Sequence, residues 1–202
     1  MNVLKSLVDK FGKADISKIP VEKLEMEHMK IETELENIEN KLDKLDEEKK
    51  ELFKQGIGAS KLKKMRLAAK IAAIEHKQQL LLLQWQELYN AYAMLDIMIA
   101  TKFDTTLNLE VWSEIKNALL EGKGTDYVFD SLLNKINENT TIWKTIKFHR
   151  DLLKKIMSKS GVMAEQGDIL KLWDSVEAKE ISPEKIEEEL SYGKLLEKEE
   201  SA

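Results

Sequence analysis

Two long runs of heptad-spaced residues constrain this fold more than any other feature of the sequence. Their positions alternate at spacings of four and three, which is the pattern of a coiled-coil seam, where one stripe of a helix packs against a partner helix. The first seam consists of Leu24, His28, Ile31, Leu35, Ile38, Leu42, Leu45, Lys49 and Leu52. The second seam consists of Leu67, Ile71, Ile74, Gln78, Leu81, Trp85, Leu88, Tyr92, Leu95 and Ile99. We therefore predict long helices over residues 21–55 and 61–102.

The stretch KKELFKQGIGASKLKKMRLAAKIAAIEHK, residues 49–77, joins the two seams. We expect a turn over residues 55–60, because Gly56 and Gly58 readily adopt the left-handed conformation that ends a helix. Ser60 can accept a hydrogen bond from a free amide at the start of the next helix. Two seams of similar length joined by so short a turn predict an antiparallel hairpin.

The composition favours an all-α fold. The 202 residues are 43% hydrophobic and 34% charged, and they include only 8 Gly and 2 Pro, which are too few turn formers for an all-β chain. We predict a long antiparallel two-helix coiled-coil hairpin with additional shorter C-terminal helices. The shorter helices are expected over residues 108–121, over 125–159 (as one helix, or as two with a break near NENTT), and after the capping residues Asp168 and Ser182.

We divide the chain into four parts. A short amphipathic N-terminal segment (1–19) precedes the antiparallel helical hairpin (20–103), a C-terminal helical region (104–192) and an acidic tail (193–202). Past residue 79 the second long helix has an apolar face too wide for one partner, so we expect the C-terminal helices or another subunit to cover it. The tip, residues 45–70, lacks this surplus of apolar residues, and we expect it to project.

The chain contains no cysteine, which excludes disulfides, thiolate metal sites and cysteine nucleophiles. Its first residues lack the apolar core of a signal peptide. No apolar run approaches the roughly 18 residues of a membrane-spanning helix. We therefore expect a cytoplasmic protein, either free or peripheral to the membrane.

No motif points to catalysis, a cofactor or a metal. The sequence GKGT at 122–125 lacks the earlier glycine and the preceding strand of a phosphate-binding loop, so we interpret it as the end of a helix. His28, His76 and His149 are far apart, and none has a second ligand one helical turn away. We interpret His28 as a polar core residue that sets the register of the first seam. The prediction is a non-enzymatic protein with no cofactor and no metal.

A cluster of basic residues follows the turn and is opposed nearby only by Glu75. In one interpretation it pairs across the hairpin with the acidic first helix, at Glu47, Glu48 and Glu51. In the other it binds an anionic membrane, a nucleic acid or an acidic surface of another subunit, and the alanines between residues 68 and 73 let another helix approach. The predicted partner-binding residues are Lys61, Lys63, Lys64, Arg66 and Lys70.

A second basic cluster lies between residues 144 and 155. Lys147, Arg150 and Lys154 follow an i, i+3, i+7 spacing and share one helical face. This face is either solvated or covered by the acidic C-terminal sequence EKIEEEL…EKEES. In the second case the three residues make an autoinhibitory contact that holds the monomer closed.

Residues 2–12 form a short amphipathic segment, in which Leu4, Leu7, Val8 and Phe11 share one face. Bulky apolar residues opposite lysines are typical of helices that lie on membranes. We therefore predict these four residues as a membrane contact. The alternative is a short helix docked on the hairpin.

The order of these parts, and the stretch EEKKELFKQGIGASKLKKMRLAAKIAAIEHKQQL, resemble the ESCRT-III and PspA group of membrane-remodelling proteins. In that group a short amphipathic segment precedes a long two-helix hairpin, several shorter helices and a regulatory C-terminal part. The corresponding residues here are 2–12, 21–102, 109–159 and 168–202. Two features depart from the group: the first long helix is acidic rather than basic, and the tail has no evident motif for the ATPase that disassembles those polymers. The resemblance implies self-assembly and membrane remodelling.

Two hypotheses about function follow. In the first, this is a non-enzymatic coiled-coil hairpin protein that self-assembles, associates with membranes, or does both. In the second, it is a soluble adaptor or regulatory subunit whose basic hairpin tip docks a protein or nucleic-acid partner. The predicted partners are another copy of the chain, another protein or an anionic membrane surface. Nucleic acid is less favoured because the net charge is −5, and we predict no small-molecule substrate.

Overall fold

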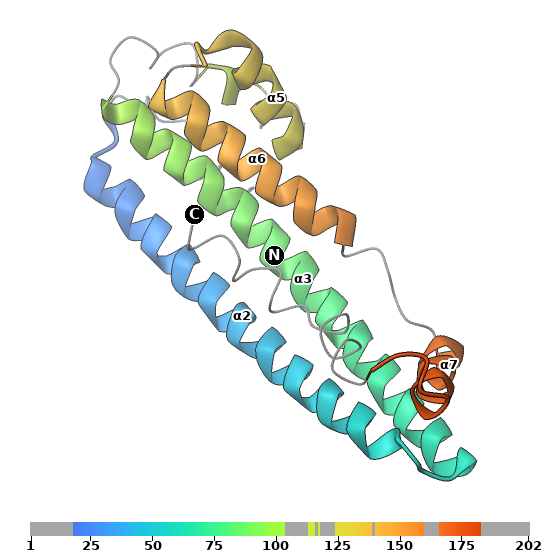
Figure 1. Cartoon of the computed structure of the whole chain (residues 1–202). Helices are drawn as coiled ribbons and strands as arrows, with labels where there is room; N and C mark the ends of the chain where they lie inside the picture. Colours follow the sequence, from blue (N-terminus) through green and yellow to red (C-terminus); the bar gives the residue numbers. More distant parts are fainter. Residues whose placement is uncertain are drawn as a thin grey trace. The chain divides into compact units, whose positions relative to one another are not determined.

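The computed structural model describes residues 18–103, 113–115, 117, 124–138, 140–159 and 166–182, and within these ranges it contains helices and no strand. The helices are α2 (Val21–Gly56), α3 (Lys61–Phe103), α5 (Thr125–Lys135), α6 (Thr141–Lys159) and α7 (Gln166–Glu177) (Figure 1). The all-helical fold class and both long helices are therefore as predicted. The region 125–159 forms two helices, with the break at NENTT. The predicted membrane-contact segment 2–12 and the acidic tail 193–202 lie outside the described residues.

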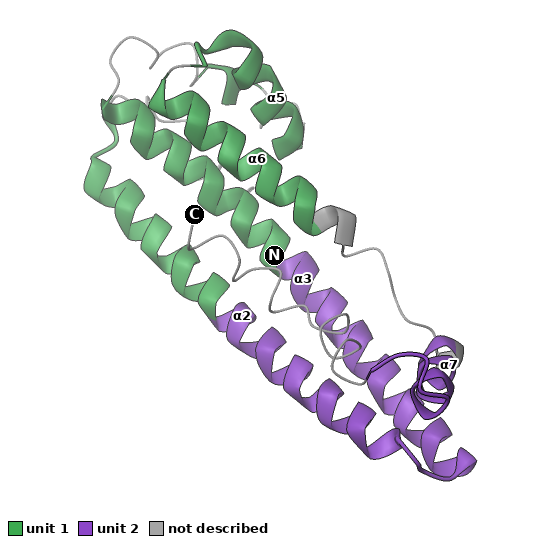
Figure 2. Cartoon of the chain, in the orientation of Figure 1, with its two compact units in different colours: residues 1–36, 85–158 green, residues 37–84, 159–202 purple. Residues whose placement is uncertain are grey.

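Contacts divide the chain into two compact units, and both long helices contribute to each of them (Figure 2). Unit 1 comprises Met1–Glu36 and Trp85–Ser158, and unit 2 comprises Asn37–Gln84 and Lys159–Ala202. Unit 1 therefore contains the start of α2, the end of α3, and helices α5 and α6. Unit 2 contains the end of α2, the turn, the start of α3, and α7.

The two long helices pack together through their predicted seams. On α2 the apolar seam residues from Leu24 to Leu45 are all buried, as are Leu67, Ile71 and Ile74 on α3. The first seam differs at its end, where Phe53 is fully buried and Leu52 only half-buried. Burial of these side chains removes a continuous apolar stripe from water, at about 25 cal/mol per Å² of apolar surface.

In unit 1, α3 is buried over a much wider face than a single seam requires. Ala91, Met94 and Ile97 are buried in addition to the seam residues Leu88 and Leu95. Helix α6 supplies part of this cover, because its His149 is hydrogen-bonded to residues of α3. From Ala91 onward the predicted apolar surplus thus has a partner among the C-terminal helices, whereas Leu80 and Leu83, which belong to the same predicted surplus, are exposed.

In unit 2, α7 packs on the tip of the long helices. Ile169, Trp173 and Val176 of α7 form one buried cluster with residues of α2 and α3, among them Phe53 and Ile71. The prediction that residues 45–70 project without cover is therefore wrong. The apolar surface there is narrow, but a single short amphipathic helix is enough to cover it.

Candidate functional site

The turn between α2 and α3 is shaped to receive the indole ring of Trp173. The ring nitrogen Nε1 of Trp173 donates a hydrogen bond of 2.8 Å to the carbonyl oxygen of Phe53, and the two rings stack with centroids 5.5 Å apart. A Cβ atom placed on Gly56 would lie 2.1 Å from Cε2 of Trp173. Glycine at position 56 therefore serves a close approach of α7, in addition to standing at the end of α2.

Gly58 carries the left-handed conformation of the turn, with a φ of +71°. Its backbone N–H donates a hydrogen bond of 2.8 Å to Oε1 of Glu177, the last residue of α7. The turn is thus tied to α7 through a backbone amide that the helices themselves do not use.

Lys64 joins the start of α3 to the same end of α7. Its Nζ atom lies 2.8 Å from Oε1 of Glu177 and 3.3 Å from Oδ1 of Asp174, and the residue is only 7% exposed. The hydrogen bond with Glu177 raises the pKa of Lys64 and is opposed by burial of the ammonium. The same bond lowers the pKa of Glu177, with help from the amide of Gly58. Lys64, predicted to bind a partner, therefore binds α7 in this structure.

The other four predicted partner-binding residues, Lys61, Lys63, Arg66 and Lys70, are exposed. Within the described part of the chain, none of them makes an ion pair. The predicted pairing with acids of the first helix is not seen there either. Glu47 accepts a hydrogen bond from Lys50 on its own helix, and Glu51 accepts one from Gln55. The start of α3 thus presents positive charge that the described residues do not neutralise.

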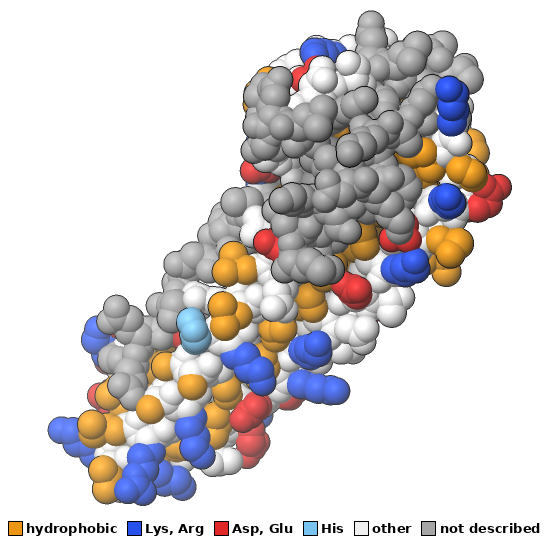
Figure 3. Space-filling model, turned by 180° about the vertical axis from the view of Figure 1, so that it is seen from behind, with side chains coloured by type: hydrophobic (Ala, Val, Ile, Leu, Met, Phe, Trp, Pro, Cys, Tyr) orange, Lys and Arg blue, Asp and Glu red, His pale blue; other side chains and the backbone are white. Residues whose placement is uncertain are grey.

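An apolar stripe runs beside these cations on the outer side of α3 in unit 2. Large parts of Leu62 (63%), Met65 (49%), Leu80 (50%) and Leu83 (60%) are exposed. We call the outer ridge the exposed residues Leu62, Met65, Ala69, Ala73, Leu80 and Leu83. Figure 3 shows Lys and Arg side chains beside apolar ones at the end of unit 2 that carries the turn.

The outer ridge was not predicted, although its spacing is present in the sequence. Leu62, Ala69, His76 and Leu83 recur every seven residues, just as the inner seam does. Exposed apolar residues at such a spacing mark a helix face that can pack against another helix.

A second feature of unit 2 is a set of buried polar side chains between α2 and α3. Lys49 is fully buried and donates a hydrogen bond of 3.1 Å to Oε1 of Gln78. Gln78 in turn donates one of 2.6 Å to Oδ1 of Asp46. The ammonium of Lys49 lies 3.9 Å from Asp46 and 3.8 Å from Glu75. Burial lowers the pKa of Lys49, and the two carboxylates oppose this shift.

Unit 1 contains a cluster of histidine and tyrosine side chains. Nδ1 of His149 lies 2.8 Å from the hydroxyl of Tyr89, and Nε2 lies 2.9 Å from Oδ2 of Asp96. The ring of His28 stacks on Tyr92 at 4.1 Å, which agrees with its predicted role as a polar residue of the seam. Because the hydroxyl-bearing Tyr89 is buried, this arrangement joins α6 to α3 instead of presenting a nucleophile to solvent.

Burial affects the ionisation of this cluster. It lowers the pKa of His28, although the nearby carboxylates of Asp96 and Glu32 oppose the shift. The Nε2 atom of His28 is buried and has no hydrogen-bond partner among the described residues. Burial also raises the pKa of Tyr92 to about 12. The neutral forms of both rings are therefore favoured.

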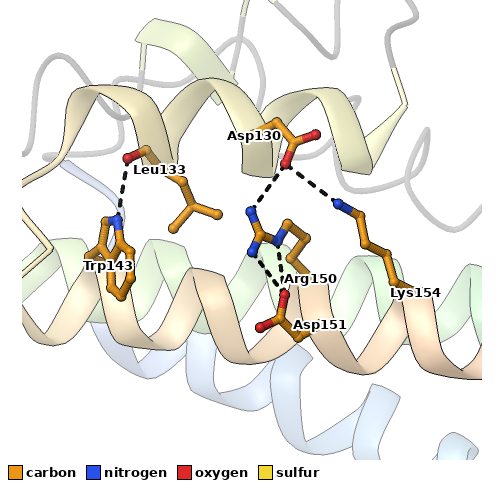
Figure 4. A network of polar contacts seen from close by, with 6 residues as sticks. All are labelled: Asp130, Leu133, Trp143, Arg150, Asp151 and Lys154. Carbon is orange, nitrogen blue, oxygen red and sulfur yellow. Dashed lines mark hydrogen bonds and ion pairs between the residues drawn. The ribbon is translucent and has the colours of Figure 1, made fainter.

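The second basic cluster is engaged with α5 and with its own helix. Arg150 lies 3.4 Å from Asp130 of α5 and 2.9 Å from Asp151, and Lys154 lies 3.9 Å from Asp130 (Figure 4). Lys147 lies over the ring of Trp143 at 5.0 Å. Two of the three residues predicted to contact the acidic tail thus share an acid of unit 1. The tail itself lies outside the described residues, so the autoinhibitory contact stays a prediction.

The described residues offer neither a metal site nor a membrane span. They contain no group of three or more His, Asp or Glu side chains placed to hold a metal ion. None of their helices combines the length and the apolar character needed to cross a membrane.

Comparison of the chain with models of known families, with curated proteins and with solved structures gave no match in any of the three cases.

Proposed function

We propose that this protein is a non-enzymatic helical adaptor. In this proposal the two long helices form an antiparallel coiled-coil hairpin, and the outer ridge of α3, with its neighbouring cations, docks a partner. The observation that carries the proposal is an exposed apolar ridge beside basic residues that have no ion pair in the described part of the chain.

The contacts between α2 and α3 support the antiparallel hairpin. In unit 2, Asp46 contacts Gln78 and Lys49 contacts Glu75, so the residue number falls on α3 as it rises on α2. Most seam residues of both helices are buried with four-three spacing, as in a coiled coil, and the apolar seam residues Leu52, Leu81 and Ile99 are half-buried.

The energetics of the outer ridge support docking. Full burial of a leucine side chain stabilises a complex by roughly 1.5–3 kcal/mol, and the ridge presents Leu62, Leu80 and Leu83 to solvent. The basic residues beside it attract an acidic partner and favour its association. An exposed apolar patch with a charged border is typical of an interaction site.

Charge disfavours packing of the outer ridge against the outer ridge of a second copy. Two outer ridges packed against each other bring like-charged lysines and arginines together, which is unfavourable. In the α2 residues of unit 2, every exposed side chain is polar, so that part of a second copy offers the ridge no apolar counterpart. The exposed apolar side chains of α2, Met26 and Met29, lie in unit 1. A different partner therefore fits the ridge better than a second outer ridge or the unit 2 part of α2 in another copy.

Association with an anionic membrane is the second candidate, as the resemblance to the ESCRT-III and PspA group implies. The exposure of Ile57, Leu62 and Met65 close to Lys61 and Lys63 favours it. Basic and apolar side chains on one surface are what a peripheral helix uses to bind anionic lipid.

Light scattering over a series of protein and salt concentrations tests the adaptor proposal. An adaptor has one discrete mass, that of a monomer or dimer, across the series. A mass that grows continuously with concentration, together with filaments or rings in electron micrographs, would show a self-assembling protein and contradict the proposal.

A further inference from the structure

The outer ridge has the spacing of a second coiled-coil seam on the same helix. Leu62, Ala69, His76 and Leu83 recur every seven residues, and Arg66, Ala73 and Leu80 stand between them. At a rise of 1.5 Å per residue the ridge is about 30 Å long, which accommodates roughly three heptads of a facing helix. We propose that it binds an acidic amphipathic helix of a partner protein. This inference rests on the proposed adaptor function and names the chemistry of the partner.

The apolar part of the ridge fits a helix. Bulky side chains stand at its two ends, with Leu62 and Met65 at one and Leu80 and Leu83 at the other. Between them Ala69 and Ala73 are small, and small residues let the backbones of two helices approach closely. A partner helix with leucines at its own seam positions can insert them between these two ends.

The positive charges beside the ridge indicate that the partner helix carries negative charge. Lys63, Lys70 and Lys77 recur every seven residues beside the ridge, and Arg66 stands at a seam position of the ridge itself, in series with Ala73 and Leu80. We call these four residues the basic rim. All four are exposed, whereas Glu75, the only acid between residues 61 and 84, is buried. In a coiled coil, charges that flank the seam select a partner with opposite charges at its flanking positions.

Helix α7 and the partner helix use different faces of α3. The buried cluster beneath α7 contains Leu67, Ala68 and Ile71, and the ion pairs with α7 come from Lys64. The ridge residues stay exposed with α7 in place. Docking on the ridge therefore leaves the described contacts between α7 and α3 in place.

The small side chains in the middle of the ridge disfavour a lipid bilayer as its ligand. Membrane insertion is driven by the apolar area that enters the lipid, and the alanines contribute little. A facing helix instead buries the small residues and the leucines together.

A synthetic acidic peptide tests the inference on the full-length protein. The probe is a fluorescent peptide of about four heptads with Leu at the seam positions and Glu at the flanking ones, and binding is followed by fluorescence anisotropy. We expect saturable binding that weakens as salt is added, since the flanking charge pairs are exposed. A peptide of the same pattern with Lys in place of Glu should not bind.

Two matched charge reversals locate the site. Arg66→Glu with Lys70→Glu should weaken binding about tenfold or more, because two exposed attractions become repulsions. Lys41→Glu with Lys44→Glu makes the same charge change at exposed positions of α2 and should leave binding unchanged. Leu80→Ser with Leu83→Ser should also weaken binding. Circular dichroism and thermal unfolding establish that each variant keeps its fold.

Three outcomes overturn the inference: the acidic peptide fails to bind, the α3 and α2 reversals weaken it equally, or the serine variant binds as well as the wild type. Binding to phosphatidylserine vesicles but not to the peptide, lost in the Arg66→Glu, Lys70→Glu variant, would identify lipid as the ligand instead. Failure of the acidic peptide to bind, with a discrete mass in light scattering and no binding to vesicles, overturns only the acidic helix as the partner and leaves the adaptor proposal standing. Binding to vesicles supports the second candidate function instead. A polymer in light scattering removes the adaptor proposal itself.

Discussion

Gly56 shows how one residue positions a helix that is distant in sequence. Because it has no side chain, the indole of Trp173 lies where a Cβ atom would stand, at 2.1 Å. We expect Gly56→Ala to lower the free energy of unfolding by about 1–3 kcal/mol, because the overpacked ring must move. Urea denaturation followed by circular dichroism measures this change.

Two comparisons separate steric conflict from a general effect of glycine replacement. Gly124 has nothing within 4 Å of its Cβ position, so Gly124→Ala should cost less than about 1 kcal/mol. In a Trp173→Ala background, the cost of Gly56→Ala should largely disappear, because the two residues are coupled through direct contact. If Gly56→Ala costs the same in both backgrounds, the close approach of Trp173 is not its cause.

His28 predicts a dependence of stability on pH. Burial lowers its pKa in the folded protein below the ordinary value of 6.5, so the unfolded chain binds a proton more readily at that site. The contribution of neutral His28 to the free energy of unfolding is therefore complete above pH 6.5. This contribution is lost as the pH falls from 6.5 toward the lower pKa that His28 has in the folded protein. The charges of Asp96 and Glu32 raise the pKa of His28 and so reduce this loss of stability, whereas His149 lowers that pKa and increases the loss.

Replacement of His28 by glutamine tests this dependence. The free energy of unfolding, measured by urea denaturation between about pH 7 and pH 5, should fall less steeply for His28→Gln than for the wild type. His76→Gln is the matched control, since His76 is exposed on α3. Equal slopes for the His28 variant and the wild type would rule out a burial effect on this imidazole.

At the scale of an element, Lys49 stabilises the two carboxylates that are buried between α2 and α3. Its ammonium lies within 4 Å of the carboxylates of Asp46 and Glu75, and all three side chains are buried. Lys49→Met should lower the free energy of unfolding by about 3–5 kcal/mol, because the buried carboxylates lose their nearest cation. The shift of the urea midpoint, with the slope unchanged, measures it.

A variant in which all three buried residues are uncharged distinguishes the effect of buried charge on stability from the effect of packing. Asp46→Asn, Lys49→Met and Glu75→Gln together should recover part of the lost stability, since no ionised group stays in the interface. Lys44→Met, at an exposed position of α2, should change the stability by less than about 0.5 kcal/mol. A triple variant less stable than Lys49→Met alone would show that packing, not charge, sets the cost.

The elements were predictable to the extent that local pattern determines them. Heptad spacing predicted α2 and α3 because a buried stripe repeats with the helix period. Lys49 and Gln78 occupy predicted seam positions, but the buried network was not predicted, because its acids Asp46 and Glu75 stand outside the seam pattern. The partner of Lys64 was not predictable, because Glu177 is 113 positions away in sequence and comes near only through the packing of α7.

At the scale of the whole molecule, each unit has buried groups of its own. In unit 2 the buried cluster is centred on Trp173, and in unit 1 the buried side chains include Tyr89 and Met94. Compact units of this kind open with separate free energies, even where they share helices. Loss of one buried cluster should therefore lower the stability mainly of the unit that contains it.

Trp173→Ala tests this separation. Removal of a buried tryptophan costs roughly 3–5 kcal/mol, because a cavity replaces its contacts. Hydrogen exchange followed by mass spectrometry should show lost protection in the unit 2 amides around Phe53 and Ile71. The unit 1 amides around Met94 and Ile146 should keep most of theirs. Equal loss in both units would mean that the long helices transmit the opening along their length, so that the chain unfolds as one cooperative body.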